Sequence, residues 1–256
     1  MPLPTDEREF SLQKTEHIYV KLTIGIIAAL VLVVALSWGG HRFYVHWQER
    51  KLMHQAHVAF DKSDFRWAAL AAQRAYAVDS TSIDACRTLS DIAERQNSPE
   101  AIEWRRRAVA IAPGSLPDQL ALARTALRFS QSKIAAGALA QIPASAQNTA
   151  DYQAIAAHLA LTQDDLPTAG RHLREAVRLA PNDPHRQLEL AEFQLRSDDR
   201  GQRDEGRALA TRLQDDSRVR VDAFHVLIDA ALRRAFAEQR SLRECGFTLA
   251  EIPNGR

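Results

Sequence analysis

Histidines near the start of the chain are the residues whose type and spacing come closest to a chemical site. His54 and His57 are three residues apart, so on a helix they would share one face and could bind a metal ion together. His41 and His46 precede them by a short distance. No carboxylate or thiolate completes a ligand set with them. We therefore predict no metal site and interpret these side chains as solvated or interfacial.

Sequence motifs of catalysis and nucleotide binding are absent: GxxxxGK[ST], GxGxxG, HExxH and GxSxG do not occur. The acidic pairs Asp164-Asp165 and Asp198-Asp199 fall between expected helices, where such residues form turns and N-caps. The run Arg105-Arg106-Arg107 is interpreted as a solvated helix face, with contact to a lipid headgroup or an acidic partner as the alternative. No catalytic residue and no cofactor is expected, so the chain is predicted not to be an enzyme.

Composition favours an all-α protein. Alanine and leucine recur throughout, and glycine and proline number only 10 each, too few for the many turns of a large β-sandwich. The formal net charge of +1 gives no strong field towards nucleic acid, so no nucleic-acid partner is predicted. Cys86 and Cys245 lie far apart and no CxxC occurs, which excludes a disulfide framework.

An apolar segment near the N-terminus predicts a transmembrane helix over residues 18–38. Residues 22–38 carry no charge, and Lys21 can snorkel towards the interface. Tyr19 and Trp38 stand near the two ends, where aromatic rings favour the membrane interface. A buried soluble helix and a cleaved signal peptide are the alternatives. Acidic residues before the segment and the bulky Trp38 after it favour an uncleaved anchor.

Membrane orientation is weakly signalled, because equal numbers of lysine and arginine residues flank the segment. A short charged N-terminal tail more often stays in the cytoplasm. We therefore expect a single-pass protein of the cell inner membrane whose main body lies in the periplasm. Gly25 and Ala29 form a pair of small residues that permits helix dimerisation, so a homo-oligomer is an open alternative.

A repeat with a period near 34 residues begins at about residue 48. Residues 108–113 and 176–181 read AVAIAP and AVRLAP, and their offset of 68 is twice 34. In each expected first helix a small residue recurs every 33 or 34 positions, which lets a neighbouring helix approach closely; these are Ala56, Ser90, Ala123, Ala157 and Ala191. Second helices are expected over residues 65–78, 99–112, 133–141, 167–180 and 204–214, and a long last helix over 219–244.

This pattern resembles the tetratricopeptide repeat (TPR), a helix–turn–helix unit of 34 residues. The resemblance implies an all-α fold, a right-handed α-α solenoid of about five TPR-like helix pairs, to which the apolar segment adds one transmembrane helix. The family's large aromatic residue in the first helix is replaced by alanine in four units and glutamine in the fifth, which implies thinner packing. The expected organisation is an N-terminal tail (1–17), the transmembrane helix (18–38), a juxtamembrane segment (39–47), the solenoid (48–217), and a C-terminal capping helix and tail (218–256).

In TPR solenoids the first helices line a concave groove, so the resemblance implies a binding face. Residues three before, one after and four after each small position are expected to share it. The candidates for partner binding are His57, Arg87, Asp91, Glu94, Arg124, Leu127, His158, Leu161, Glu192 and Leu195. The same rule adds Met53, Phe60, Leu120, Ala154 and Leu188. The alternative is that the apolar members belong to the core between repeats and the polar members are merely solvated.

A groove with apolar edges and a polar column suits an amphipathic helix or an extended peptide. We expect a membrane-anchored TPR scaffold that binds protein or peptide partners and contacts the lipid bilayer through residues 18–38, in assembly or regulation of a bacterial cell envelope. The alternatives are an accessory subunit of a membrane enzyme complex and a self-assembling membrane protein. A carboxylate clamp of the chaperone-binding kind needs lysine and asparagine on this face, and neither occurs there.

Two further resemblances are incomplete. Anchored repeat proteins that regulate lipopolysaccharide assembly end in a metal-binding CxxC pair, which this chain lacks. Residues 246–251 resemble the cleavage motif of type IV prepilins, but in that family a hydrophobic helix follows at once, whereas here five residues remain. We interpret the motif as a coincidence or a relic.

Overall fold

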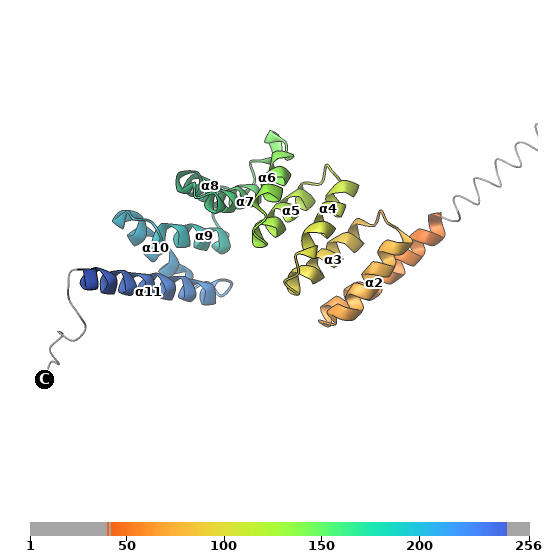
Figure 1. The fold of residues 1–256 in the computed structure, drawn as a ribbon, viewed down its shortest axis with the longest axis horizontal. Helices are drawn as coiled ribbons and strands as arrows, with labels where there is room; N and C mark the ends of the chain where they lie inside the picture. Colours follow the sequence, from red (N-terminus) through yellow and green to blue (C-terminus); the bar gives the residue numbers. More distant parts are fainter. Residues whose placement is uncertain (1–39, 41, 245–256) are drawn as a thin grey trace, which may run out of the picture. The chain divides into compact units, whose positions relative to one another are not determined.

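A computed structural model describes residue 40 and residues 42–244, whose regular elements are all helices (Figure 1). They are a first helix over residues 42–61, then α2 (Phe65–Val78), α3 (Ile83–Arg95), α4 (Glu100–Ile111), α5 (Leu116–Arg128), α6 (Ser132–Ala140), the 3₁₀ turn η1 (Ala144–Ala146), α7 (Ala150–Thr162), α8 (Leu166–Leu179), α9 (Pro184–Leu195), α10 (Arg200–Leu213) and α11 (Arg220–Glu244). The all-α class is therefore confirmed for the described residues.

Several predictions concern residues outside this range. The N-terminal tail (1–17), the transmembrane segment (18–38), His41, Cys245 and the prepilin-like motif (246–251) all lie outside the described residues. Among the residues that are described, no helix combines the length and the apolar composition needed to cross a bilayer.

The helices form two compact units that divide between Arg107 and Ala108, within α4. Unit 1 holds the first helix, α2, α3 and the start of α4; unit 2 continues to α11. Each unit has cores of its own, one of them around Met53 and Leu89 in unit 1 and another around Leu173 and Leu190 in unit 2. The repeat pattern, which runs through both units without interruption, did not reveal this division.

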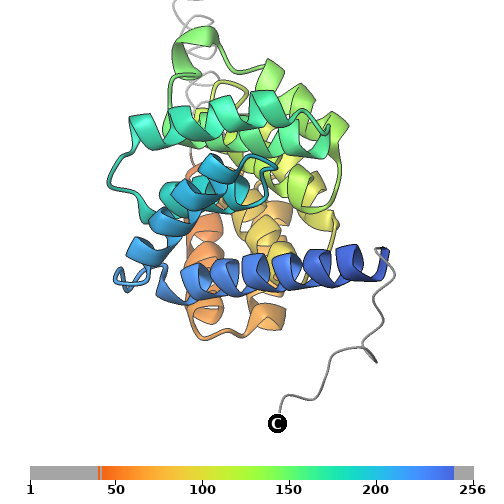
Figure 2. The ribbon, with the colours of Figure 1, turned by 90° about the vertical axis from the view of Figure 1, so that its left-hand side faces the viewer.

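The small positions of the repeat lie where the pattern placed them, inside the core. All five are fully buried, with no exposed surface: Ala56, Ser90, Ala123, Ala157 and Ala191. In unit 2 the helices pair as hairpins, α5 with α6, α7 with α8 and α9 with α10, and α11 packs on α10 and α9 (Figure 2). Small buried residues permit this close pairing because no side chain holds the backbones apart.

The expected second helices are confirmed. The helix predicted over residues 65–78 is α2 (Phe65–Val78), and the others agree within one residue, except that α10 begins at Arg200, four residues before the predicted start. Asp199 accounts for the earlier start, because its carboxylate accepts a hydrogen bond from the backbone N–H of Gln202 and caps the helix. Asp165 caps α8 in the same way, as its sequence position predicted.

Four of the turns inside the hairpins share one backbone conformation. Each contains a residue with positive φ, between 54° and 61°, and these recur at intervals of 34, 33 and 34: Ser63, Asn97, Ser130 and Asp164. The N–H of the next residue donates to a carbonyl five positions back, as when Gln131 N–H donates to Ala126 O at 2.8 Å. This is the bond of a Schellman motif, whose positive-φ position usually holds glycine. The four carbonyls belong to the alanines that replace the TPR family's aromatic residues.

Substitution of Ser130 tests this turn. Ser130→Val should destabilise unit 2 by about 1–2 kcal/mol, because a β-branched residue disfavours positive φ. Ser130→Gly should be near neutral, since glycine adopts this conformation freely but loses more entropy on folding. Urea denaturation followed by far-UV circular dichroism measures both changes. Ser145→Val, at an exposed serine whose φ is not positive, is the matched control. Equal effects of the two valine substitutions would contradict the conformation assigned to Ser130.

Candidate functional site

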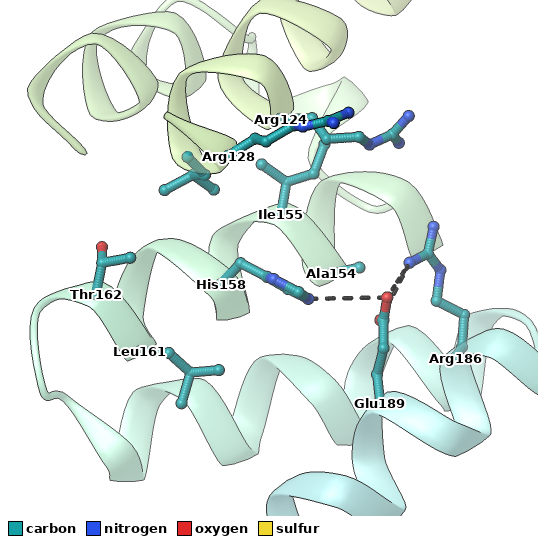
Figure 3. A pocket seen from close by; sticks show the side chains of 10 residues that line it. Arg124, Arg128, Ala154, Ile155, His158, Leu161, Thr162, Arg186 and Glu189 are labelled. Carbon is teal, nitrogen blue, oxygen red and sulfur yellow. Dashed lines mark hydrogen bonds and ion pairs between the residues drawn. The ribbon is translucent and has the colours of Figure 1, made fainter. Parts of the chain in front are cut away.

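The helices α5, α7 and α9 of unit 2 enclose a cavity of about 450 Å³ (Figure 3). A second hollow of about 670 Å³ continues from it between α7, α8, α9 and the start of α10. The two hollows are contiguous, because His158, Leu161 and Glu189 line both. We call them together the unit 2 groove.

A chain of charged side chains crosses the first hollow. Arg186 Nη2 donates to Asp151 Oδ1 at 2.5 Å, and its Nη1 donates to Glu189 Oε1 at 3.0 Å. Figure 3 shows Glu189 between Arg186 and His158, whose Nε2 lies 3.7 Å from Glu189 Oε1. At the other end, Arg124 Nη2 lies 3.9 Å from Asp151 Oδ1. The chain therefore links α5, α7 and α9 through alternating positive and negative groups.

Arg186 is the anchor of this chain. Its side chain is only 15% exposed, while the side chain of Arg124 is 61% exposed. Burial lowers the pKa of Arg186, but the charges and hydrogen bonds of Glu189 and Asp151 raise it by more, so the guanidinium stays charged. Its Nε finds no hydrogen-bond acceptor among the described residues, because the nearby carboxylate oxygen of Asp183 is 3.8 Å away. Arg186 is thus held by two carboxylates, whereas Arg124 is a cation of this chain that is open to solvent.

Glu189 is ionised under neutral conditions. Burial raises the pKa of its carboxyl group, but the nearby His158 and the charge and hydrogen bonds of Arg186 outweigh burial and bring the pKa below its ordinary value. A carboxyl group with a lowered folded-state pKa adds stability above its ordinary pKa. That contribution is lost as the pH falls through the folded-state value.

Comparison of the full chain with a Glu189→Gln variant isolates this contribution. The variant should be less stable than the unsubstituted chain at pH 7, because glutamine cannot neutralise Arg186. The difference should shrink as the pH falls and vanish once Glu189 is protonated. Urea midpoints between pH 7 and pH 3 measure it. A difference that stays constant with pH would show that the charge of Glu189 is not responsible.

The groove has an apolar floor beside this charged chain. Leu127 of α5 and Ile155 and Leu161 of α7 line it, and Leu161 is 37% exposed although it is a large apolar residue. The second hollow adds Leu166 and Phe193. An apolar floor with charged groups along one side can hold a ligand that carries both apolar and charged side chains.

The predicted groove residues of unit 2 divide between the unit 2 groove and a separate hollow. Glu192 lines the second hollow, where it accepts a hydrogen bond from Arg196. Leu195 lies elsewhere: it is partly buried and lines a separate hollow between α9 and α11. The first hollow brings together four of the predicted residues, namely Arg124, Leu127, His158 and Leu161.

In unit 1 the predicted residue His57 contacts residues of α3, the helix that also carries the predicted Arg87. His57 Nε2 lies 3.2 Å from the hydroxyl of Thr88 and 3.5 Å from a carboxylate oxygen of Asp84, both on α3. Arg87 is exposed on the same helix and engages in interactions of its own. Among the described residues, no group of three or more histidine, cysteine, aspartate or glutamate side chains is arranged to hold a metal ion.

Asp91 and Glu94 of α3 both bind Arg105 of α4. Arg105 Nη2 donates to Asp91 Oδ1 at 2.5 Å and to Glu94 Oε1 at 3.2 Å, and the Arg105 side chain is only 12% exposed. Arg107 lies over the ring of Trp104, 4.3 Å from its centroid. The prediction that the run of three arginines is a solvated face is therefore wrong for Arg105, which the α3 carboxylates cover, whereas Arg106 and Arg107 are exposed.

Sequence reasoning missed Asp151, Arg186 and Glu189. Glu189 precedes the small residue Ala191 by two positions, and Ile155 precedes the small residue Ala157 by two. The prediction instead used the residue three positions before each small residue. Four of the five residues three before are instead buried, at 8% exposure or less, whereas Arg87 is exposed; the four are Met53, Leu120, Ala154 and Leu188. The positions two before and one after a small residue are three residues apart and share a helix face, so the groove includes a position on the predicted face that the prediction left out.

Neither a protein-family model nor a curated protein sequence matches the chain. Solved structures do match it. PilW, described as a widely conserved type IV pilus biogenesis factor, is 16% identical, with a TM-score of 0.60 over 81% of this chain and 95% of its own. PilF of Pseudomonas aeruginosa is 14% identical, with a TM-score of 0.58 over 83% and 95%. YrrB, described as a TPR protein with an unusual peptide-binding site, is 14% identical, with a TM-score of 0.51 over 68% and 89%.

At these identities the likeness concerns the fold. Together with the buried small positions and the paired helices, it defines the class: the described chain has a TPR-like helical-repeat fold. Stacked helical repeats of this kind build extended concave surfaces. Which partner this chain has is a separate matter, because function depends on the site and not on the fold.

Proposed function

We propose that this chain is a non-catalytic, membrane-anchored scaffold that binds a segment of a protein partner in the unit 2 groove. The observation that carries the proposal is the groove itself, in which an apolar floor runs beside a fixed chain of charges over three helices. Rigid charged groups set the register of a bound peptide, and apolar hollows take up its side chains. TPR-like grooves suit this mode of binding.

The groove favours a segment that pairs an apolar side chain with an acidic one. Leu127, Ile155 and Leu161 offer contacts to the apolar side chain. Arg186 is already neutralised by Asp151 and Glu189, whereas Arg124 is mostly exposed and 3.9 Å from its carboxylate partner. A carboxylate of the peptide would therefore bind at Arg124, where it meets a cation that is incompletely paired.

We place this activity in assembly or regulation of a bacterial cell envelope, possible pilus biogenesis included. Residues 18–38 supply the expected membrane anchor, and the expected location is the inner membrane with the repeats in the periplasm. The likeness to PilW, a type IV pilus biogenesis factor by its description, and to YrrB, described with a peptide-binding site, supports the proposal by analogy.

Site-specific photo-crosslinking in cells tests the groove. A photoreactive amino acid in place of Leu161, on the floor, should give a discrete adduct with a partner protein. The same amino acid in place of Arg178, exposed on α8, should not. Arg124→Glu should reduce the Leu161 adduct at least tenfold if a peptide carboxylate binds there. Equal adducts from both positions would overturn the proposal.

The identity of the adduct separates the alternatives. A subunit of a membrane enzyme in the Leu161 adduct would replace the scaffold with an accessory subunit, and a second copy of this chain would indicate self-assembly. Reporter fusions after Arg256 test the location independently. Activity of a reporter that works only in the periplasm is expected. Fluorescence of one that works only in the cytoplasm would overturn the proposed orientation.

A further inference from the structure

The last helix, α11, carries apolar residues on two faces. One face packs into unit 2, where Ala223 is fully buried and joins a core cluster with Leu188 and Leu213. The other face is open. It holds five large apolar side chains that are between 46% and 67% exposed, which we call the α11 stripe: Val221, Phe224, Ile228, Leu232 and Phe236.

The stripe is continuous along one side of the helix. Its members are three or four residues apart, so they share one face over a length of about 22 Å. A terminal helix of a solenoid normally caps the core and turns a polar face outwards. A contiguous row of exposed large apolar residues on such a helix therefore marks an interaction surface.

The charges beside the stripe indicate what covers it. Asp222, Asp229 and Arg233 are seven and four residues apart, so they follow one flank of the stripe, acidic in its first half and basic at its end. Within one copy, Arg233 Nη2 donates to Asp229 Oδ2 at 2.5 Å. Asp222 is therefore the acidic residue at the other end of this flank. In an antiparallel pair of such helices, Asp222 of one copy lies near Arg233 of the other. A parallel pair would instead place the two charged flanks on opposite sides of the interface, where Asp222 and Arg233 of different copies could not pair.

We infer that the α11 stripe binds the same stripe of a second copy, with the two helices antiparallel and the two-fold axis near Ile228. Five half-exposed side chains of this size offer on the order of 500 Å² per copy, to which the flanking charged residues add. A stable interface needs roughly 800 Å² per partner, so the pair forms a dimer of moderate affinity. A lipid surface fits less well, since interfacial helices carry basic residues beside the apolar face, and Asp222 and Asp229 stand there.

Disulfide crosslinking of the full chain tests the pairing and its direction. In a Cys245→Ser background, where the remaining Cys86 is buried, Ile228→Cys should link two copies on oxidation, because it lies at the two-fold axis. Val221→Cys should not link to itself, but should link to Phe236→Cys on a differently tagged copy. Self-linking of Val221→Cys without the mixed product would show a parallel pair and overturn the arrangement.

The mass of the chain in solution gives an independent readout. Sedimentation of the full chain should show a monomer–dimer equilibrium, and the double substitution Ile228→Asp, Leu232→Asp should weaken it about 30-fold or more. Trp67→Asp, at an apolar residue of α2 that is 49% exposed and lies outside the groove and the stripe, is the matched control and should leave the equilibrium unchanged. A monomeric mass at all concentrations, or crosslinks from Ile228→Cys only to other proteins, would overturn the inference. Because the stripe and the unit 2 groove use different residues, this result and the photo-crosslinking result are independent.

Discussion

Replacing Arg186 by methionine is expected to lower the free energy of unfolding of unit 2 by about 2–3 kcal/mol. The methionine fills much of the same volume, but Asp151 and Glu189 lose the cation that neutralises both. Glu189 is the more affected, because its side chain is only 28% exposed and its charge would remain in a partly buried site. The estimate lies below the loss for a fully buried ion pair because Asp151 is more than half exposed and water screens it.

The chain offers both a matched control and an internal reference for this measurement. Arg178→Met removes an arginine from a similar pair with Glu175, but that arginine is exposed, so the denaturation midpoint should not change. All four tryptophans of the chain precede residue 108, so their fluorescence does not report on unit 2, while far-UV circular dichroism reports on both units. The loss caused by Arg186→Met should therefore appear in the circular dichroism transition of unit 2.

A second substitution identifies the cause of the loss. If the stranded charge of Glu189 is responsible, the double variant Arg186→Met, Glu189→Gln should recover part of the stability that the single variant loses. If the stability losses of Arg186→Met and Glu189→Gln simply add in the double variant, the pair contributes through packing and not through charge. That result would also weaken the proposal that these groups form a fixed side of the groove.

The repeat pattern could predict the helices and the core because both depend on local periodicity. A small residue every 33 or 34 positions indicates where helices approach each other, and Ala157 and Ala191 are fully buried as expected. Pro167 and the preceding Asp165 likewise indicate where α8 begins, whereas the start of α10 was predicted four residues late. These features are encoded within short stretches of sequence, and no knowledge of the neighbouring helix is needed to recognise them.

The side chains of the groove depend on how neighbouring helices are rotated, which periodicity does not specify. A rotation of one helix face by a single position exchanges Leu188, which is buried, for Glu189, which lines the groove. The burial of Arg105 has the same origin, because Asp91 and Glu94 reach it only across the packed pair α3 and α4. Sequence therefore predicted Arg124 and His158 as residues of the site, but not the groups Asp151, Arg186 and Glu189 that interact with them.

Gly206 in α10 is the second position where a small change should have a large effect. A Cβ atom at this residue would lie 2.8 Å from the carbonyl oxygen of Ala191 and 3.1 Å from the backbone nitrogen of Leu195, both in α9. These are backbone atoms, so a side-chain rotation cannot relieve the overlap. Alanine normally stabilises a helix interior by about 1 kcal/mol relative to glycine. Here the forced separation of α9 and α10 should outweigh that gain, and Gly206→Ala should destabilise unit 2 by about 2 kcal/mol.

Gly137→Ala provides the opposite case within the same unit. Gly137 lies inside α6, and a Cβ atom there would have no neighbour within 4 Å. The same substitution should therefore raise the stability of unit 2 by about 0.5–1 kcal/mol. Denaturation of the two variants side by side measures a difference in sign, which does not depend on the absolute scale. If Gly206→Ala also stabilised the chain, α9 and α10 could not be as close as the structure has them. The second hollow of the groove, which Glu192 of α9 and Gln202 of α10 both line, would then have a different shape.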